Sequence, residues 1–347
     1  MTFNLLAVEA RPGPAFVDAL RHAWLEGDAV LPLDPRLSVP AQRALAEAMR
    51  VGDPVEPGDA LVVPTSGTTG APKGVVLTHA AVTSAAAITS AALATDPSAD
   101  TWLCQLPLAH VGGLGIVTRF LCTGTPLTFD PDDASATLTS AVPTQLERDD
   151  HSRFRAVLVG GSADWRRDRA ANVVRTYGLT ETGGGIVYNG RALDGVSVRI
   201  ATDGQVLLKS PTLLRCYRDG TDPKDADGFL PTGDDGELSD DGVLSVFGRR
   251  GDVIVTGGEK VWPDPVERVL RTVPGVADVA VVGRPDPEWG AAVTAVVVVA
   301  DGSATPSLDA LRDAVRSALP PWCAPKAVEV VADLPRTALG KVQRSKL

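Results

Sequence analysis

The stretch Thr65-Ser-Gly-Thr-Thr-Gly-Ala-Pro-Lys-Gly74 has the residue types that bind a phosphate group. Its glycines let the backbone turn through conformations closed to other residues, so that several N–H groups can point at one anion. The interleaved hydroxyls add donors, and Lys73 adds a mobile positive charge. Pro72 stands where the Gly-x-x-x-x-Gly-Lys-Ser/Thr loop has its second glycine, which excludes the ordinary ATPase or GTPase loop. A merely flexible surface loop would need neither the proline nor the hydroxyls, so we interpret the stretch as a phosphate-binding loop.

Two later stretches have the chemistry to hold a nucleoside. Val159-Gly-Gly-Ser162 ends a strand-like run in glycines, against which a flat base can lie. In Tyr177-Gly-Leu-Thr-Glu181 the tyrosine ring can stack on the base, the threonine hydroxyl can reach a phosphate, and the glutamate is a hard oxygen ligand for Mg²⁺. A β-turn with an ordinary solvated glutamate is the alternative explanation of the second stretch alone.

Three shorter patterns add a carboxylate, an imidazole and an ammonium that could also contact ligands. The carboxylate of Thr232-Gly-Asp234 can accept hydrogen bonds from both ribose hydroxyls, although this tripeptide alone is a common turn. His110 precedes a helical pattern with a glycine-rich entrance, where a hydrogen-bonded core histidine explains the segment equally well. Gly340 before Lys341 lets an ammonium enter a site and stabilise developing negative charge, and a basic surface tail is the alternative.

In this order, over residues 65–341, the stretches resemble the motifs of the adenylate-forming superfamily, which includes acyl-CoA synthetases, adenylation domains and luciferases. The resemblance implies that these residues bind ATP, that one carboxylate binds Mg²⁺, and that a histidine borders the acyl pocket. The implied ATP-binding residues are Thr65, Ser66, Gly67, Thr68, Thr69, Gly70, Lys73, Gly161, Ser162, Tyr177, Thr180, Asp234, Arg249 and Lys341. The implied catalytic residues are Lys341, His110, Thr180 and Glu181, with Glu181 as the metal ligand.

The chain departs from the superfamily pattern at one position. Gly251 stands two residues after Arg249, where the superfamily usually has an aspartate or lysine that acts as a hinge. Glycine absorbs a backbone rotation even more readily, so we expect a hinge at Gly251 or Asp252. The rotation implied by the resemblance withdraws Lys341 after adenylation and presents the Gly257-Gly258 turn to the pantetheine of CoA.

Within the superfamily the chain most closely resembles the o-succinylbenzoate–CoA ligases of menaquinone biosynthesis, in particular their short actinobacterial type. The resemblance rests on the early position of the phosphate stretch, on Tyr177-Gly-Leu-Thr-Glu-Thr-Gly-Gly-Gly-Ile-Val-Tyr188, and on Leu193-Asp-Gly-Val196. It implies an acid–thiol ligase that forms an acyl-adenylate and pyrophosphate from acid and ATP, then a CoA thioester and AMP. No nucleophilic side chain is required, and the chain has no Gly-x-Ser-x-Gly elbow.

Such an acid carries a second, ring-borne carboxylate that must be bound without being activated. A buried carboxylate without donors would cost several kcal/mol, so the pocket must supply donors or a positive charge. The candidates are the N–H groups of Gly183, Gly184 and Gly185 and the hydroxyl of Tyr188, with His110 guiding the reacting carboxylate from the opposite wall.

The elements that position these residues predict an α/β fold. Strand-like runs at 59–64, 101–106, 155–159 and 172–176 alternate with helical patterns at 79–93, 114–122 and 163–171. This alternation predicts a largely parallel sheet covered by helices, with the phosphate stretch at the carboxyl end of a strand. Upstream we expect helices at 14–25 and 38–50 around a strand at 28–33. Because the phosphate stretch begins already at Thr65, the resemblance implies an N-terminal region trimmed relative to most of the superfamily.

The pattern changes twice further along. Short runs at 196–200, 205–209, 236–239 and 243–247, separated by Gly/Asp turns, predict a small antiparallel β subdomain, with Asp234 in a loop before its last hairpin. Beyond residue 248 a βα unit, strands at 276–283, 291–299 and 327–331, and a helix at 307–318 predict a compact α+β unit. We therefore expect an adenylation domain over residues 1–248 and a mobile C-terminal domain over residues 249–347.

Charge, hydropathy and cysteine spacing limit the kinds of molecule that the protein is expected to bind. A net charge of −10 without a basic tract argues against binding to nucleic acid or anionic membranes, and the most apolar run, 291–300, is too short to cross a bilayer. The N-terminal residues have no basic leader and do not resemble a signal peptide. Cys104, Cys122, Cys216 and Cys323 are far apart, which indicates reduced thiols in a cytoplasmic protein without structural zinc. The expected partners are small molecules, and the sequence leaves homo-oligomerisation open.

Two other functions are compatible with parts of this pattern. A CoA ligase for another aryl or short acyl acid would keep every motif and differ only in its pocket. A non-catalytic protein that binds acyl-adenylates would be expected to lack Lys341 or Glu181, and both are present. No carrier domain follows Leu347, which disfavours an adenylation domain that loads a fused carrier.

Overall fold

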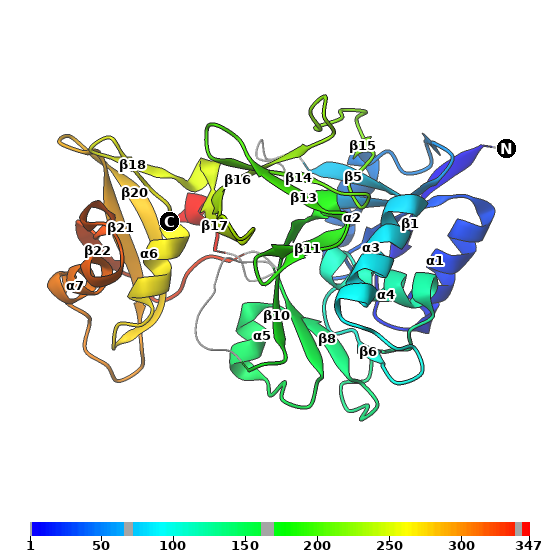
Figure 1. Cartoon of the computed structure of the whole chain (residues 1–347), viewed down its shortest axis with the longest axis horizontal. Coiled ribbons are helices and arrows are strands. Elements are labelled where there is room, and N and C mark those ends of the chain that lie inside the picture. The colour runs from blue at the N-terminus through cyan, green and yellow to red at the C-terminus, as the bar shows by residue number, and fades with distance from the viewer. Residues whose placement is uncertain (1, 66–71, 161–169, 337–341) are drawn as a thin grey trace.

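The computed structural model describes residues 2–65, 72–160, 170–336 and 342–347 (Figure 1). Several predicted residues lie outside these ranges, as does most of the helical pattern expected at 163–171. They are Ser66, Gly67, Thr68, Thr69 and Gly70 of the phosphate stretch, Gly161 and Ser162 of the base stretch, and Lys341.

The first sheet carries the phosphate stretch and is mixed. It has six strands in the order β15-β5-β4-β2-β1-β3. Their bounds are β1 Phe3–Glu9, β2 Ala29–Leu33, β3 Pro54–Val55, β4 Asp59–Thr65, β5 Lys73–Thr78 and β15 Cys216–Tyr217. Strand β2 runs parallel to β1 and β4, whereas β3, β5 and β15 are antiparallel to their neighbours. The expectation of a largely parallel sheet was therefore wrong here, because β4 and β5 form a hairpin around the phosphate stretch.

The second sheet has seven strands in the order β12-β11-β10-β9-β8-β6-β7. Their bounds are β6 Trp102–Leu103, β7 Leu127–Thr128, β8 Leu138–Ala141, β9 Ala156–Val159, β10 Val173–Leu179, β11 Gly184–Tyr188 and β12 Arg191–Ala192. Strands β6 to β10 pair in parallel, as the alternating pattern predicted, and β11 and β12 extend the sheet in antiparallel fashion.

Helices α3 (His79–Ala92) and α4 (Val111–Thr123) share one hydrophobic core with both sheets. That core includes Leu61 and Val75 of the first sheet, Trp102 and Leu158 of the second, and Leu114 of α4. Helix α3 begins where expected because the Thr78 hydroxyl accepts a hydrogen bond from Ala81 N at 3.1 Å. The remaining helices of the N-terminal part are α1 Pro14–Glu26, α2 Val39–Ala48 and α5 Pro143–Arg148.

The predicted antiparallel subdomain is a four-stranded sheet in the order β13-β14-β16-β17. Its strands are β13 Ser197–Ile200, β14 Gln205–Lys209, β16 Leu230–Leu238 and β17 Leu244–Arg249. Asp234 was expected in a loop but lies within β16, next to a register shift between Asp235 and Gly236. The strand placement holds its carboxylate more firmly than a loop would, because the backbone is paired to β17.

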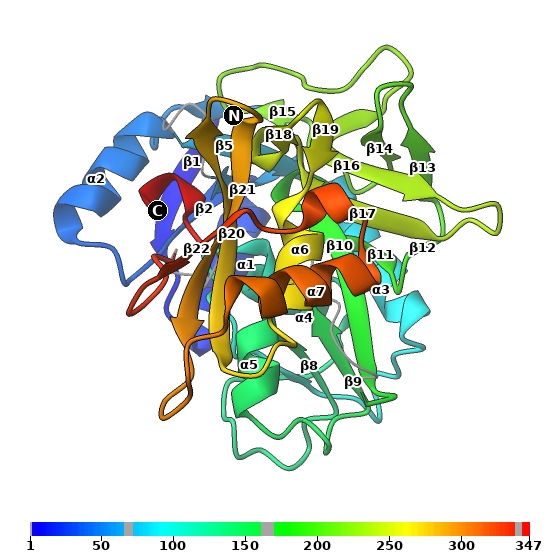
Figure 2. The same ribbon diagram turned by 90° about the vertical axis from the view of Figure 1, so that its left-hand side faces the viewer.

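The C-terminal part forms the other end of the molecule (Figure 1). It contains the hairpin β18 (Ile254–Thr256) and β19 (Glu259–Val261), helix α6 (Pro263–Leu270), and the sheet β20 (Val276–Asp286), β21 (Gly290–Val299) and β22 (Ala327–Val330). Helix α7 (Leu308–Ala318) and α6 lie side by side (Figure 2) and bury Val266, Leu270, Leu311 and Val315 in a core of their own. Each such apolar side chain contributes about 1.5–3 kcal/mol when buried.

Short 3-10 turns complete the described elements. They are η1 Thr180–Thr182, η2 Arg250–Asp252, η3 Pro321–Cys323 and η4 Arg344–Lys346. None of the helices within the described ranges combines the length and the apolar composition that a bilayer crossing requires.

Candidate active site

The two ends of the phosphate stretch face each other across the β4–β5 hairpin. Thr65 and Lys73 are paired in register, and the Thr65 hydroxyl lies 3.4 Å from the Lys73 carbonyl oxygen. At the neighbouring Gly74 a Cβ would lie 2.6 Å from the Met49 sulfur and 2.8 Å from Val62, so only glycine fits. The hairpin thus fixes the entry and the exit of the stretch while Lys73 lies at its exit.

Tyr217 joins Lys73 to Glu181. The Lys73 ammonium lies 4.8 Å from the centre of the Tyr217 ring, and the Tyr217 hydroxyl donates to Glu181 Oε1 at 2.9 Å. Burial, followed by the neighbouring Glu181 carboxylate, raises the pKa of Tyr217, so its hydroxyl stays protonated and keeps donating. Thr180 and Glu181 both lie in the turn η1, directly after β10. The structure therefore brings together the predicted phosphate lysine and the predicted metal ligand.

A second cluster joins the three residues expected around the nucleoside. The Tyr177 hydroxyl donates to Asp234 Oδ2 at 2.8 Å, and Arg249 Nε lies 3.0 Å from Asp234 Oδ1. Arg249 also donates to the Thr232 carbonyl at 2.8 Å, which fixes the plane of its guanidinium. Burial first, and then Asp234, raise the pKa of Tyr177. Asp234 is 5% exposed. Its carboxylate is held by donors from two different strands, β10 and β17.

His110 occupies the N-cap position of α4 without a side-chain capping bond. Its Nε2 lies 4.0 Å from Asp34 Oδ2, and Asp34 in turn receives the Arg36 side chain at 2.6 Å. Burial lowers the pKa of His110, while Asp34 opposes that change. A neutral imidazole at this position can orient a carboxylate without adding a fixed charge.

Helix α4 also carries Arg119, which the sequence analysis did not single out. Its guanidinium lies 4.7 Å from the Trp102 ring and next to Tyr188 and Cys104. Arg119 Nε and Nη1 are buried, and no hydrogen-bond partner for either lies among the described residues. Burial lowers the pKa of Arg119. A buried guanidinium whose N–H groups have no acceptor is unfavourable unless an anion binds to it.

The guanidinium of Arg119 reaches back along the helix toward His110. A Cβ placed on Gly115 would lie 3.6 Å from Arg119 Nη2, as expected for a helical side chain that leans toward the N-terminus. Gly115 is five positions after His110, about 7.5 Å along the helix. Helix α4 therefore carries an imidazole at its N-cap and, further along, a guanidinium that leans back toward the N-terminus.

Tyr188 lies against this arginine but its hydroxyl is already engaged. It donates to Thr89 Oγ1 of α3 at 3.2 Å, and the residue is 7% exposed. Burial raises the pKa of Tyr188, so the phenol stays neutral. The hydroxyl that was predicted to donate to the ring carboxylate is thus bonded to Thr89, and Arg119 is the stronger candidate for charge recognition.

The glycine run at 183–185 serves different purposes at each position. Gly183 and Gly184 have φ of 68° and 126°, conformations that side chains disfavour. At Gly185 a Cβ would lie 2.6 Å from Thr176 Cβ, so this glycine permits close packing of β11 on β10. The same holds for Gly178, where a Cβ would lie 2.0 Å from the Gly184 carbonyl oxygen. Close strand packing therefore accounts for Gly185 without any contact to a substrate.

The predicted hinge residues lie between ion pairs to the β subdomain and ion pairs to the C-terminal part. Arg250 binds Asp203 at 2.7 Å and Asp235 at 3.2 Å, both in the β subdomain. Asp252 instead pairs with Arg344 of the C-terminal part at 3.2 Å. Gly251 lies between them, and a Cβ there would meet nothing within 4 Å. Gly251 therefore lies between a residue held by the β subdomain and a residue held by the C-terminal part.

Gly257 and Gly258 form the turn of the β18–β19 hairpin with φ of 59° and 87°. Two consecutive positive φ angles are what a tight two-residue hairpin requires. Gly257 N donates to the Trp289 carbonyl at 2.9 Å, and a Cβ on Gly257 would lie 2.8 Å from the Trp289 ring.

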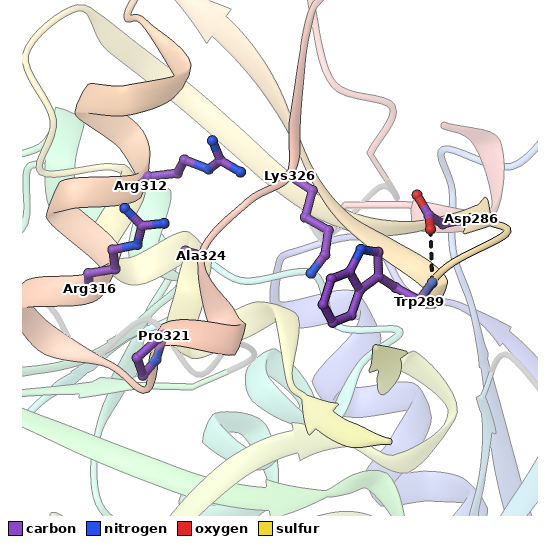
Figure 3. A pocket seen from close by; sticks show the side chains of 7 residues that line it. All are labelled: Asp286, Trp289, Arg312, Arg316, Pro321, Ala324 and Lys326. Atoms are coloured by element: carbon purple, nitrogen blue, oxygen red, sulfur yellow. Dashed lines mark hydrogen bonds between the residues drawn. The ribbon is translucent and has the colours of Figure 1, made fainter. Parts of the chain in front are cut away.

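A basic pocket lies on the same side of the C-terminal part (Figure 3). The Lys326 ammonium lies 4.0 Å from the centre of the Trp289 ring, and the side chains of Arg312 and Arg316 extend from α7 toward them. Asp286, Pro321 and Ala324 complete the lining. Arg312 and Arg316 lie 4.0 and 3.9 Å from aspartates of their own helix, so both remain available to an anion.

Glu181 would act as a single protein ligand for a metal ion. Among the described residues no group of three or more His, Cys, Asp or Glu side chains is arranged to hold one. A carboxylate that leaves the other coordination sites to phosphate oxygens and water is the arrangement that suits Mg²⁺.

The described site differs from the expected one in a few named positions. The sequence missed Tyr217, which no local pattern marks, and Asp34, which is distant from His110 in the chain. Arg119 did carry a signal, because it is the sole charged residue in the apolar helix Val111–Thr123.

Comparison with known proteins matches two families. Residues 23–217 match the family of AMP-binding enzymes, and residues 265–341 match the AMP-binding enzyme C-terminal domain. A probable 2-succinylbenzoate–CoA ligase from Mycobacterium tuberculosis is 39% identical, with 90% of this chain and 91% of that protein covered. An indoleacetate–CoA ligase from Aromatoleum aromaticum is 33% identical, with 98% and 78% covered.

Solved structures agree with this fold. The o-succinylbenzoate CoA synthetase from Bacillus subtilis, in complex with its acyl-adenylate intermediate, superposes with a TM-score of 0.85 at 26% identity, covering 99% of this chain and 87% of that one. The same enzyme with ATP and a magnesium ion gives a TM-score of 0.85 at 25% identity, with 99% and 89% covered.

Proposed function

Because the chain belongs to the AMP-binding enzyme family, we propose that it is an ATP-dependent acid–CoA ligase acting on 2-succinylbenzoate, also named o-succinylbenzoate. The reaction joins the acid to the α-phosphate of ATP with release of pyrophosphate, and CoA then displaces AMP to give the thioester. Relatives named for this substrate, and a neighbour solved with its acyl-adenylate, support this choice of acid. Such a thioester would be an intermediate of menaquinone biosynthesis, and the unpaired cysteines agree with a cytoplasmic reaction.

The observation that carries the choice of a diacid is Arg119. A guanidinium with buried N–H groups that lack a partner among the described residues is costly unless a ligand supplies an anion. The ring carboxylate of o-succinylbenzoate would be that anion, while His110 at the other end of the region orients the carboxylate to be activated. An acid with one carboxylate would leave Arg119 without a counterion, which disfavours simpler aryl acids.

In the first step the described residues hold and orient ATP. Asp234, Arg249 and Tyr177 hold the nucleoside, and Lys73 approaches the phosphates from the exit of the phosphate stretch. Glu181, oriented by Tyr217, would hold Mg²⁺, which when bound neutralises charge on the phosphate oxygens. Lys341 would stabilise the charge that develops during attack on the α-phosphorus. The acid needs no protein nucleophile, because its own carboxylate attacks.

In the second step CoA reaches the acyl-adenylate along the C-terminal part. The Gly257-Gly258 turn has no side chains to obstruct pantetheine. The pocket with Arg312, Arg316 and Lys326 offers three cations for the phosphates of CoA (Figure 3). Rotation about Gly251 would exchange Lys341 for this turn.

An exchange experiment tests the proposal. Purified protein with ATP, Mg²⁺ and labelled pyrophosphate should incorporate label into ATP only when o-succinylbenzoate is present. No exchange with this acid, together with exchange for indoleacetate, would reassign the substrate. No exchange with any acid would support a non-catalytic binding protein instead.

A further inference from the structure

The described residues on both sides of the segment 337–341 are fixed to the body of the C-terminal part. Arg336 and Val342 form an isolated antiparallel bridge, and Gln343 N donates to the Pro335 carbonyl at 2.7 Å. Val342 packs into a small core with Leu334 and Leu347. Arg336 and Val342, the described residues that flank the segment, therefore lie next to each other in the fold.

A chain of alternating charges connects these two ends. Arg336 binds Asp278, Asp278 lies 3.4 Å from Arg271, and Arg271 lies 3.4 Å from Glu267 of α6. Glu267 Oε1 then accepts from Arg344 Nη2 at 2.8 Å. The network thus starts one residue before the segment and returns three residues after Lys341.

Arg344 is the centre of this network. Its Nη2 also donates to Asp264 Oδ1 at 2.6 Å, and its Nη1 donates to Asp252 Oδ2 at 3.2 Å. The Arg344 side chain is 15% exposed and the Glu267 side chain 4%. Burial disfavours the charged form of Arg344, but the surrounding carboxylates outweigh it and raise its pKa. The guanidinium therefore stays charged, is largely buried, and donates hydrogen bonds to three carboxylates at once.

The contact with Asp252 links this network to the hinge. Asp252 follows Gly251, and Arg250 on the other side of Gly251 is held by the β subdomain. A rotation about Gly251 would consequently move Asp252 and Arg344 together.

We propose that Arg344 is a positioning residue for adenylation, which fixes the backbone beside Lys341 to α6 and to the hinge through Glu267, Asp264 and Asp252. The proposal rests on the proposed adenylation chemistry. A lysine side chain has many rotamers, so its ammonium reaches a defined point only if the backbone that carries it is held. A misplacement of about 1 Å in such a group can cost about 100-fold in rate.

The test separates the two half-reactions. Arg344→Gln should lower the kcat of acid-dependent pyrophosphate exchange about tenfold to 100-fold, with the KM for ATP nearly unchanged. Conversion of supplied acyl-adenylate and CoA to thioester should stay within about threefold, because that step does not use Lys341. Arg344→Lys keeps the charge but not the fork, so it should recover part of the exchange.

A double variant separates positioning from stability. Arg344→Gln alone leaves Glu267 buried with fewer partners and is expected to lower Tm. Adding Glu267→Gln removes that buried charge and should recover part of the Tm, because the contacts to Asp264 and Asp252 stay lost. Exchange should remain low in the double variant. Recovery of exchange together with Tm would overturn the proposal, as would an equal loss of both half-reactions in Arg344→Gln.

Two further variants complete the design. Asp252→Asn removes only the contact to the hinge and should lower exchange in a protein that folds normally, and unchanged exchange would contradict the role of that contact. Arg284→Gln is the matched control, because Arg284 makes a bidentate pair with Glu329 and binds the Leu347 carbonyl in the same part of the fold. It should leave both half-reactions unchanged.

The failure of this proposal is distinguishable from failure of the substrate assignment. If the unaltered protein shows no exchange with o-succinylbenzoate, the substrate is wrong, and the Arg344 comparison is made with the acid that does support exchange. If no acid supports exchange, the role of Arg344 falls with the proposed function.

Discussion

Replacing Arg119 with methionine should convert a diacid site into a monoacid site. Methionine keeps most of the length and packing of the side chain on Trp102 but removes the guanidinium. The affected ligand group is the ring carboxylate of o-succinylbenzoate. Its matched analogue is 4-oxo-4-phenylbutanoate, which keeps the carboxylate to be activated and lacks the ring carboxylate.

The magnitude follows from the burial of Arg119 Nε and Nη1. Removing one partner of a buried, hydrogen-bonded charge pair costs about 2–5 kcal/mol. This corresponds to a loss of roughly 30-fold to several-thousand-fold in kcat/KM for the diacid. The analogue makes no such pair, so its kcat/KM should stay the same or rise, since the uncompensated cation is gone.

Stability should move in the opposite direction to activity. In the protein without ligand, two guanidinium atoms are buried without a partner among the described residues, so their removal relieves a desolvation cost. The lost contact with Trp102 offsets part of that gain, by about 1 kcal/mol. We therefore expect Tm to be unchanged or higher in Arg119→Met.

The assay is pyrophosphate exchange with both acids in the unaltered protein and in the variant. Arg153→Met is the control, because Arg153 lies 4.6 Å from the Phe154 ring on the exposed surface. An equal loss for both acids in Arg119→Met would refute charge recognition and leave Arg119 as a packing residue.

Three other changes probe the rest of the site. Asp234→Asn removes a charged acceptor from the nucleoside cluster and should raise the KM for ATP about tenfold to 100-fold, the equivalent of about 1.5–3 kcal/mol, in exchange assays at varied ATP. Tyr217→Phe removes the donor to Glu181 and should lower kcat about tenfold and raise the Mg²⁺ concentration required, which a Mg²⁺ titration measures. Burial lowers the pKa of His79 below its ordinary value of 6.5, so its stabilisation is complete above that pH and is lost as the pH falls through the native pKa. Tm should therefore decline between about pH 7 and pH 5, and less steeply in His79→Asn.

The sequence predicted local elements well where their periodicity was clear. The helical patterns at 14–25 and 79–93 became α1 and α3, and the apolar run at 291–300 became the buried strand β21. The local pattern was sufficient because the spacing of apolar residues within a helix or a buried strand follows directly from which of its faces are buried. The domain boundary near 248 stays a prediction, supported by the separate core of the C-terminal part.

Pairing between strands was harder to predict. No element was assigned to residues 3–9, yet β1 lies between β2 and β3 in the first sheet. No element was assigned to the residues between Gly74 and Thr78 either, although they belong to β5 opposite β4. Both depend on partners that are chosen by the whole sheet and leave little trace in a short window.

The residues of the candidate site also differ in whether a local pattern could predict them. Lys73, Glu181, Tyr177, Asp234 and Arg249 were found from motifs, because each motif keeps fixed spacing around one ligand group. Tyr217 and Asp34 come from parts of the chain distant from the residues they contact, so their contacts required the fold. Arg119 was within reach of sequence reasoning, since a lone arginine in an apolar helix must find an anion or a route to water.

The most direct test of the central claim is the product that the unaltered protein forms when acids compete. Equal concentrations of o-succinylbenzoate, 4-oxo-4-phenylbutanoate, benzoate and a medium-chain acid are incubated with ATP, Mg²⁺ and CoA, and the thioesters are identified by mass spectrometry. We predict o-succinylbenzoyl-CoA as the dominant product, with AMP formed in equal amount. A dominant thioester of another acid, or formation of ADP in place of AMP, would contradict the account.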